Sequence, residues 1–181
     1  MKLLRTIRLD ASDTFVFDRP AEPGEWAVSG AFVFWNEDVV ELQGKARSAF
    51  RSGFLGVESL GWSTLVQIVE ADEADRARVV ELLAEKLVAH FGAPNMETAR
   101  VAAEEEVAFA ESLCTEPKDV LVAVHRRFED GAVRETFRTL RPREGAEPNR
   151  VFAFLEVEGE GEDEQPADQV DLVAIAGGDR K

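Results

Sequence analysis

The first seventy residues alternate between short apolar segments and turns. Residues 2–9 place apolar and charged side chains at a period of two, which is typical of a strand with one buried face. Residues 14–17 form a short apolar run, and residues 26–35 are rich in aromatic and β-branched residues, so we expect strands there too. Residues 62–70 are apolar on both faces, which indicates a central strand.

The middle of the chain predicts a pair of helices. Asp72 is a suitable N-cap with Asp75 three positions on, and Gly92 with Pro94 ends the first helix. A second helix follows Asn95 and runs to about Cys114. Apolar residues at helical spacing form the inner faces of the two helices: Val79, Val80, Leu83, Leu87 and Phe91 in the first, and Ala99, Ala102, Ala103, Phe109, Ala110 and Leu113 in the second.

A β-hairpin follows the helices. Residues 120–128 and 133–141 flank Asp130-Gly131, a favoured two-residue turn. With this turn, Phe128 faces Val133 and Arg126 pairs with Glu135 across the strands. The opposite face of the hairpin then carries Arg127, Arg134, Arg138, His125 and Thr136.

Together these elements predict an α+β fold, with a mainly antiparallel sheet of about six to seven strands and the helical hairpin packed on one face. Residues 151–157 can add a strand, so residues 1–157 form a single α+β domain. Residues 158–181 are an acidic, Gly- and Pro-containing linker followed by a short apolar segment.

The net charge is −15, and it is unevenly distributed. Residues 72–116 carry eleven acidic and four basic side chains, whereas residues 118–143 carry four acidic and seven basic ones. An acidic surface repels nucleic acid, and no apolar run reaches the ~20 residues of a membrane helix. We therefore expect no nucleic-acid or membrane partner. A single cysteine and the absence of a secretory signal favour the cytoplasm.

Groups that commonly carry catalysis are scarce, with one cysteine, two histidines and no tyrosine. The sequence contains no P-loop, no dinucleotide fingerprint and no Gly-x-Ser-x-Gly elbow. His90 and His125 with Cys114 do not have the spacing of a metal site. We therefore name no catalytic residue, no cofactor and no metal ligand.

The arginine-rich hairpin face is the first candidate site. Arg127, Arg134 and Arg138 offer planar forks of donors for carboxylates or phosphates, and His125 adds a pH-dependent charge. The alternative is a solvated sheet face whose charges maintain solubility.

The segment 44–56 is the second candidate. Lys45, Arg47 and Arg51 stand among serines and glycines that can bind an anion through backbone amides. Phe54 and its apolar neighbours can instead fill the core or form a partner-docking surface.

Glu106 is the third candidate, because it falls on the apolar side of the second helix. Desolvation there would raise the pKa of its carboxyl group and suit it to acid–base work. Alternatively, it lies at the margin of the apolar stripe and reaches solvent or an arginine.

Two segments resemble a family of small uncharacterised proteobacterial proteins. They are residues 15–26 (Phe-Val-Phe-Asp-Arg-Pro-Ala-Glu-Pro-Gly-Glu-Trp) and residues 50–65 (Phe-Arg-Ser-Gly-Phe-Leu-Gly-Val-Glu-Ser-Leu-Gly-Trp-Ser-Thr-Leu). The resemblance spans about residues 1–145 and implies no activity or catalytic residue.

The favoured functional interpretation is a non-enzymatic cytoplasmic accessory domain that binds another protein through segregated acidic and basic surfaces. The alternative is a small-molecule or anion-binding protein, or an enzyme, that uses the arginine-rich hairpin face. A nucleic-acid mimic presenting acidic helices is a third hypothesis. The sequence leaves a homo-oligomer open.

Overall fold

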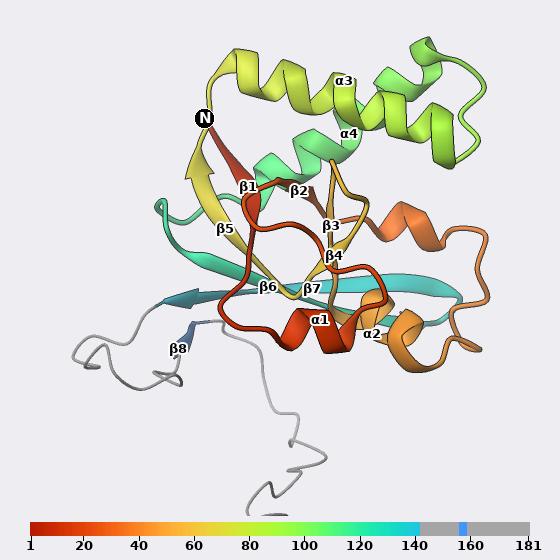
Figure 1. Ribbon diagram of the computed structural model, residues 1–181, viewed down its shortest axis with the longest axis vertical. Coiled ribbons are helices and arrows are strands. Elements are labelled where there is room, and N and C mark those ends of the chain that lie inside the picture. The colour runs from red at the N-terminus through yellow and green to blue at the C-terminus, as the bar shows by residue number, and fades with distance from the viewer. Residues whose placement is uncertain (142–155, 159–181) are drawn as a thin grey trace, which may run out of the picture.

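A computed structural model describes residues 1–141 and 156–158 of the chain. Its strands form one antiparallel sheet in the order β4-β3-β2-β1-β5-β6-β7-β8 (Figure 1). The strands are β1 (Lys2–Ile7), β2 (Trp26–Val28), β3 (Phe54–Gly56), β4 (Trp62–Ser63), β5 (Leu65–Glu70), β6 (Leu121–Glu129), β7 (Ala132–Arg141) and β8 (Glu156–Glu158). The predicted α+β class is confirmed. The described sheet has eight strands where about six to seven were expected, and four of these strands are only two or three residues long.

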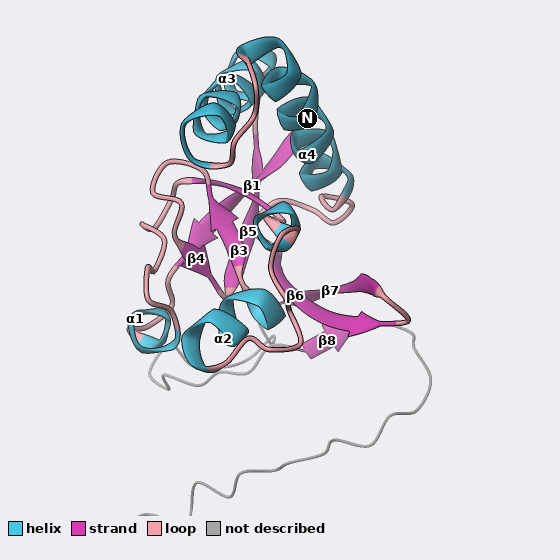
Figure 2. Cartoon of the chain, turned by 90° about the vertical axis from the view of Figure 1, so that its right-hand side faces the viewer, coloured by secondary structure: helices cyan, strands magenta, loops and turns pink. Residues whose placement is uncertain are grey.

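The predicted helical hairpin consists of α3 (Glu73–His90) and α4 (Met96–Ser112). Asp72 and Asp75 form the capping box that begins α3, and Asn95 caps α4. α4 packs on β1 and β2, and alanines on its inner face allow the close approach. Figures 1 and 2 show this hairpin at one end of the molecule and the short helices α1 and α2 at the other.

The main core lies between the sheet and the helical hairpin. Leu4, Val66 and Ile68 of the central strands are fully buried against Leu83 and Ala103 of the two helices. Inward and outward side chains alternate along β5, so this strand is central but has one half-buried face. A smaller cluster contains the aromatic side chains that hold α1 and α2.

Two predicted strands are wrong. Residues 14–16 belong to the short helix α1 (Ser12–Val16), and Phe17, in extended conformation, is its C-cap and donates its amide to the carbonyl oxygen of Asp13. Asp10 accepts a hydrogen bond from the Ser12 amide just before this helix. The strand predicted over residues 26–35 ends at Val28 and is followed by the 3₁₀ helix η1 (Ala31–Phe34). Gly30 lies between them in the left-handed conformation, at φ 78°, which interrupts the extended backbone.

The β6–β7 hairpin has the predicted register. Phe128 lies opposite Val133, Arg126 opposite Glu135, and Arg127 opposite Arg134. β5 pairs with β6 only over residues 121–123, so within the described chain residues 124–129 have no partner strand on that side. Helix α2 (Gly44–Ser52) packs along this open edge.

The strand predicted over residues 151–157 is described only at Glu156 and Val157, as part of β8. The linker and apolar segment were predicted over residues 158–181. Glu158 is the last residue of β8, and residues 159–181 lie outside the described residues. No helix in the described part of the chain combines the length and the apolar character that crossing a membrane requires.

Candidate functional site

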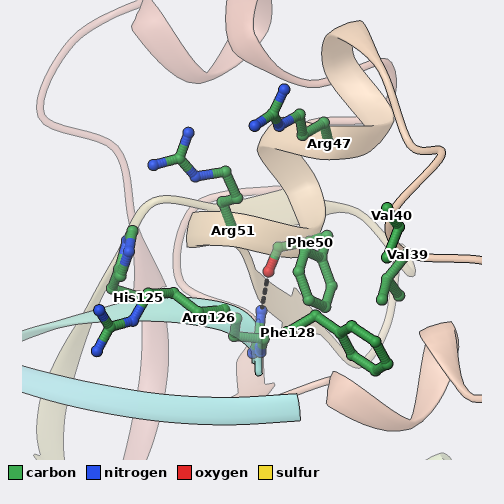
Figure 3. A pocket seen from close by; sticks show the side chains of 9 residues that line it. Val39, Val40, Arg47, Phe50, Arg51, His125, Arg126 and Phe128 are labelled. Atoms are coloured by element: carbon green, nitrogen blue, oxygen red, sulfur yellow. Dashed lines mark hydrogen bonds between the residues drawn. The ribbon is translucent and has the colours of Figure 1, made fainter. Parts of the chain in front are cut away.

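A pocket of about 370 Å³ opens between α2 and the unpaired edge of β6 (Figure 3). It lies where β6 continues beyond β5 and a helix takes the place of a neighbouring strand. The pocket is lined by Val39, Val40, Arg47, Phe50, Arg51, His125, Arg126, Arg127 and Phe128.

Helix α2 contributes two of the cationic side chains. Arg47 and Arg51 are four residues apart, so they share one helical face. Phe50 lies on a different face of α2 and packs edge-on against Phe34, with ring centroids 5.3 Å apart. This contact anchors α2 and leaves both arginines exposed at the pocket.

Strand β6 contributes side chains from both of its faces. Successive residues of a strand point to opposite sides, so His125 and Arg127 lie on one face and Arg126 and Phe128 on the other. Because β6 has no partner strand along this edge in the described chain, residues from both of its faces line the same pocket. Figure 3 shows His125 beyond Arg51, with Phe50 and Phe128 at the other end of the pocket.

The pocket is electropositive. Burial lowers the pKa of His125, and the charges of Arg51, Arg127 and Arg138 lower it further. The imidazole is therefore neutral near pH 7 when the pocket is empty. Arg127 pairs with Glu129 at 3.5 Å, whereas Arg47 and Arg51 form no ion pair with any residue that the structure describes.

Arg126 holds the base of this pocket, and its burial was not predicted. Its side chain has an exposed fraction of 0%. Nη1 donates to the carbonyl oxygens of Phe50 at 3.1 Å and Gly53 at 2.7 Å, and so ties the end of α2 to β6. Nη2 donates to the carbonyl oxygen of Ser29, and Nε donates to Glu135 at 2.7 Å. The predicted pairing of Arg126 with Glu135 places both side chains on the face of the hairpin opposite Arg127 and Arg134. This pairing is the feature of the sequence from which the burial of Arg126 could have been predicted.

Glu106 lies near this buried pair and does not line the pocket. One of its carboxylate oxygens, Oε2, is buried without a hydrogen-bond partner. Burial raises its pKa to about 7, the negative charge of Glu135 adds to the rise, and Arg126 opposes it. Glu106 is thus a half-buried acid whose carboxyl group has a raised pKa.

The other candidate residues are placed elsewhere. Lys45 lies 3.8 Å from Asp18, and Arg134 is exposed near the turn of the hairpin. Arg138 does not line the pocket, although its charge acts on His125. Phe54 is completely buried in β3, so the structure corrects its proposed role in partner binding and makes it a core residue.

Metal-binding and thiol chemistry find little support in the described residues. Within residues 1–141 and 156–158, no three His, Cys, Asp or Glu side chains converge as metal ligands would. Cys114 is buried, and burial raises its pKa to about 11. The chemistry available at the pocket is therefore electrostatic recognition by arginine and histidine beside an apolar wall.

Comparison with known proteins identifies the family. Residues 1–155 match the model of a family of unknown function, DUF6505. The chain belongs to this family. The match agrees with the resemblance to uncharacterised proteins and extends it to residue 155. No curated protein matches the chain, and no solved structure matches it.

Proposed function

We propose that the protein binds a small organic anion in the pocket between α2 and β6. The observation that carries the proposal is the convergence of Arg47 and Arg51 with His125 and Arg127, from two elements far apart in the sequence. This convergence supports the anion-binding alternative over the accessory role.

The charge distribution supports the same conclusion. The chain carries 36 acidic side chains, yet within the described residues none forms an ion pair with Arg47 or Arg51. Arg127, which pairs with Glu129 at 3.5 Å, lies directly opposite Arg134 across the hairpin, and such a pair of like charges is destabilising. A bound anion would offset this repulsion.

The shape and composition of the pocket fit an amphipathic ligand. A guanidinium group recognises carboxylate or phosphate oxygens through two parallel hydrogen bonds. Val39, Val40, Phe50 and Phe128 supply an apolar wall on which an aliphatic or aromatic body can rest. The volume of about 370 Å³ lies in the range of small-molecule sites.

Isothermal titration calorimetry with phenyl phosphate and benzoate tests this proposal. We expect binding of at least one anion, and weakening by about 10-fold or more in Arg51→Gln, because a hydrogen bond to a charged group contributes roughly 1.5–3 kcal/mol. Arg78→Gln is the matched control, since Arg78 is an exposed helical arginine on α3. Absence of binding, or equal weakening in both variants, would overturn the proposal.

A second candidate is the cytoplasmic accessory role, which two exposed aromatic side chains favour. Trp35 and Phe15 are the two most exposed large apolar side chains among the described residues, with exposed fractions of 85% and 74%. Affinity capture of wild type beside Trp35→Ser and Phe15→Ser would identify a stoichiometric partner that the variants lose. Identical capture by all three proteins would remove this candidate.

A further inference from the structure

The positive charges of arginines from three elements act on His125. Arg51 is on α2 and lines the same pocket, Arg127 is on the same strand β6, and Arg138 is on β7. Thr136 lies directly opposite His125 in the hairpin. The carboxylate of Glu129 lies near this group through its pairing with Arg127. The arrangement is therefore strongly cationic before the imidazole itself carries a charge.

The three arginine charges resist protonation of His125, and a bound anion removes that resistance. By linkage, when a ligand that favours the protonated imidazole binds, the protein must take up a proton at His125. The effect grows with ligand charge, because each additional negative charge interacts with the same guanidinium groups.

We propose, on the basis of the proposed function, that the ligand is an organic dianion of the phosphate-monoester class and that His125 takes up a proton when this ligand binds. The neutral imidazole of the empty pocket becomes an imidazolium that donates a hydrogen bond to a phosphate oxygen.

The donors of the pocket match this class better than a carboxylate. A phosphate monoester carries nearly two negative charges at pH 7 and three strong acceptor oxygens. Arg47 and Arg51 offer guanidinium forks to these oxygens, and Arg127, paired with Glu129, adds a further positive charge. His125 gains a second N–H donor when it is protonated. A carboxylate has one charge and two oxygens, so it cannot use all of these groups.

The test is calorimetry at pH 7.5 with phenyl phosphate, in Tris and in triethanolamine. Both buffers are cationic and do not compete for the pocket, and they differ in ionisation enthalpy. At this pH a phosphate monoester, with a second pKa near 6, is almost fully deprotonated and releases little proton itself. The difference between the two observed enthalpies therefore reports proton uptake by the protein.

We expect an uptake of at least about 0.3 proton per phenyl phosphate, which falls to nearly zero in His125→Gln. We also expect phenyl phosphate to bind about 10-fold or more tightly than benzoate, because the second charge meets further guanidinium groups. Glu106→Gln should retain the uptake, since Glu106 does not line the pocket.

The outcomes separate the two proposals. Failure of both anions to bind would overturn the proposed function itself. Binding of phenyl phosphate without uptake, or uptake that persists in His125→Gln, would overturn the role of His125 and leave anion binding intact. Equal affinities for phenyl phosphate and benzoate would overturn the dianion class.

Discussion

The guanidinium of Arg126 and the carboxylate of Glu135 form an ion pair inside the protein, with Nε and Oε1 2.7 Å apart. Ser29 donates a hydrogen bond from its hydroxyl to the same carboxylate oxygen at 2.6 Å. The three residues come from β6, β7 and the segment after β2, so one buried charge joins the β6–β7 hairpin to the rest of the sheet. The same guanidinium also binds the end of α2 and thereby sets the position of the pocket arginines.

Arg126→Met is expected to lower the free energy of unfolding by about 3–5 kcal/mol, because it leaves the carboxylate of Glu135 without its counter-charge and removes the guanidinium donor from several buried carbonyl groups. Urea denaturation followed by circular dichroism measures the loss. Arg134→Met on the exposed face of the same hairpin should change the stability by less than about 0.5 kcal/mol. Equal stability of wild type and Arg126→Met would contradict the structural role of the pair.

Glu106 should make stability depend on pH. Its pKa is about 7 in the folded protein and near the ordinary value of 4.5 when unfolded, so the folded state binds the proton more tightly. The stabilisation by protonated Glu106 is complete below about pH 4.5 and is lost as the pH rises through 7.

Glu106→Gln should remove this pH dependence. At pH 8 its free energy of unfolding should exceed that of wild type by on the order of 2 kcal/mol, and at pH 4.5 the two should differ little. Denaturant midpoints at several pH values provide the measurement, and Glu85→Gln on the exposed face of α3 is the control. Parallel pH profiles for wild type and Glu106→Gln would show that Glu106 ionises normally.

Much of the fold could be predicted because its signals are local. Asp130-Gly131 fixes the register of the hairpin, and Asp72 with Asn95 marks where the two long helices begin. The apolar run at residues 14–17 misleads because a single short turn contains too few residues to show helical spacing.

The pocket could be predicted only in parts. The sequence predicts two separate candidate sites, one that contains Arg47 and Arg51 and another that contains His125 and Arg127. In the structure these four residues line one pocket. Their convergence depends on where β5 stops pairing with β6, which no local pattern encodes. Burial of Arg126 depends on the same packing, since a charged residue in a strand is usually at the surface.

Gly30→Ala should be strongly destabilising. Gly30 has a φ of 78°, and an added Cβ would lie 2.5 Å from the Cβ of Leu55 in β3. We expect a loss of about 3 kcal/mol or more in the free energy of unfolding, from backbone strain and from overpacking. Gly24→Ala is the matched control, because its φ is 85° with nothing within 4 Å of the added Cβ, and should cost only about 1 kcal/mol. Equal losses would show that the contact with Leu55 is unimportant.

Cys114 should react slowly with thiol reagents. It is buried, donates to the carbonyl oxygen of Ala110 and has a pKa raised to about 11 by burial. We expect its modification by 5,5′-dithiobis(2-nitrobenzoate) at pH 8 to be about 100-fold slower in the folded protein than in urea. Equal rates in the two states would place the thiol at the surface.

Anion binding between α2 and β6 is tested most directly by a ¹H–¹⁵N correlation spectrum recorded during titration with phenyl phosphate. We expect saturable shifts in the Nε–H signals of Arg47 and Arg51 and in the backbone amides of residues 125–128. Signals from α3, at the opposite end of the molecule from α2, should stay in place. Shifts confined to α3, or no saturable shift at all, would contradict anion binding in this pocket.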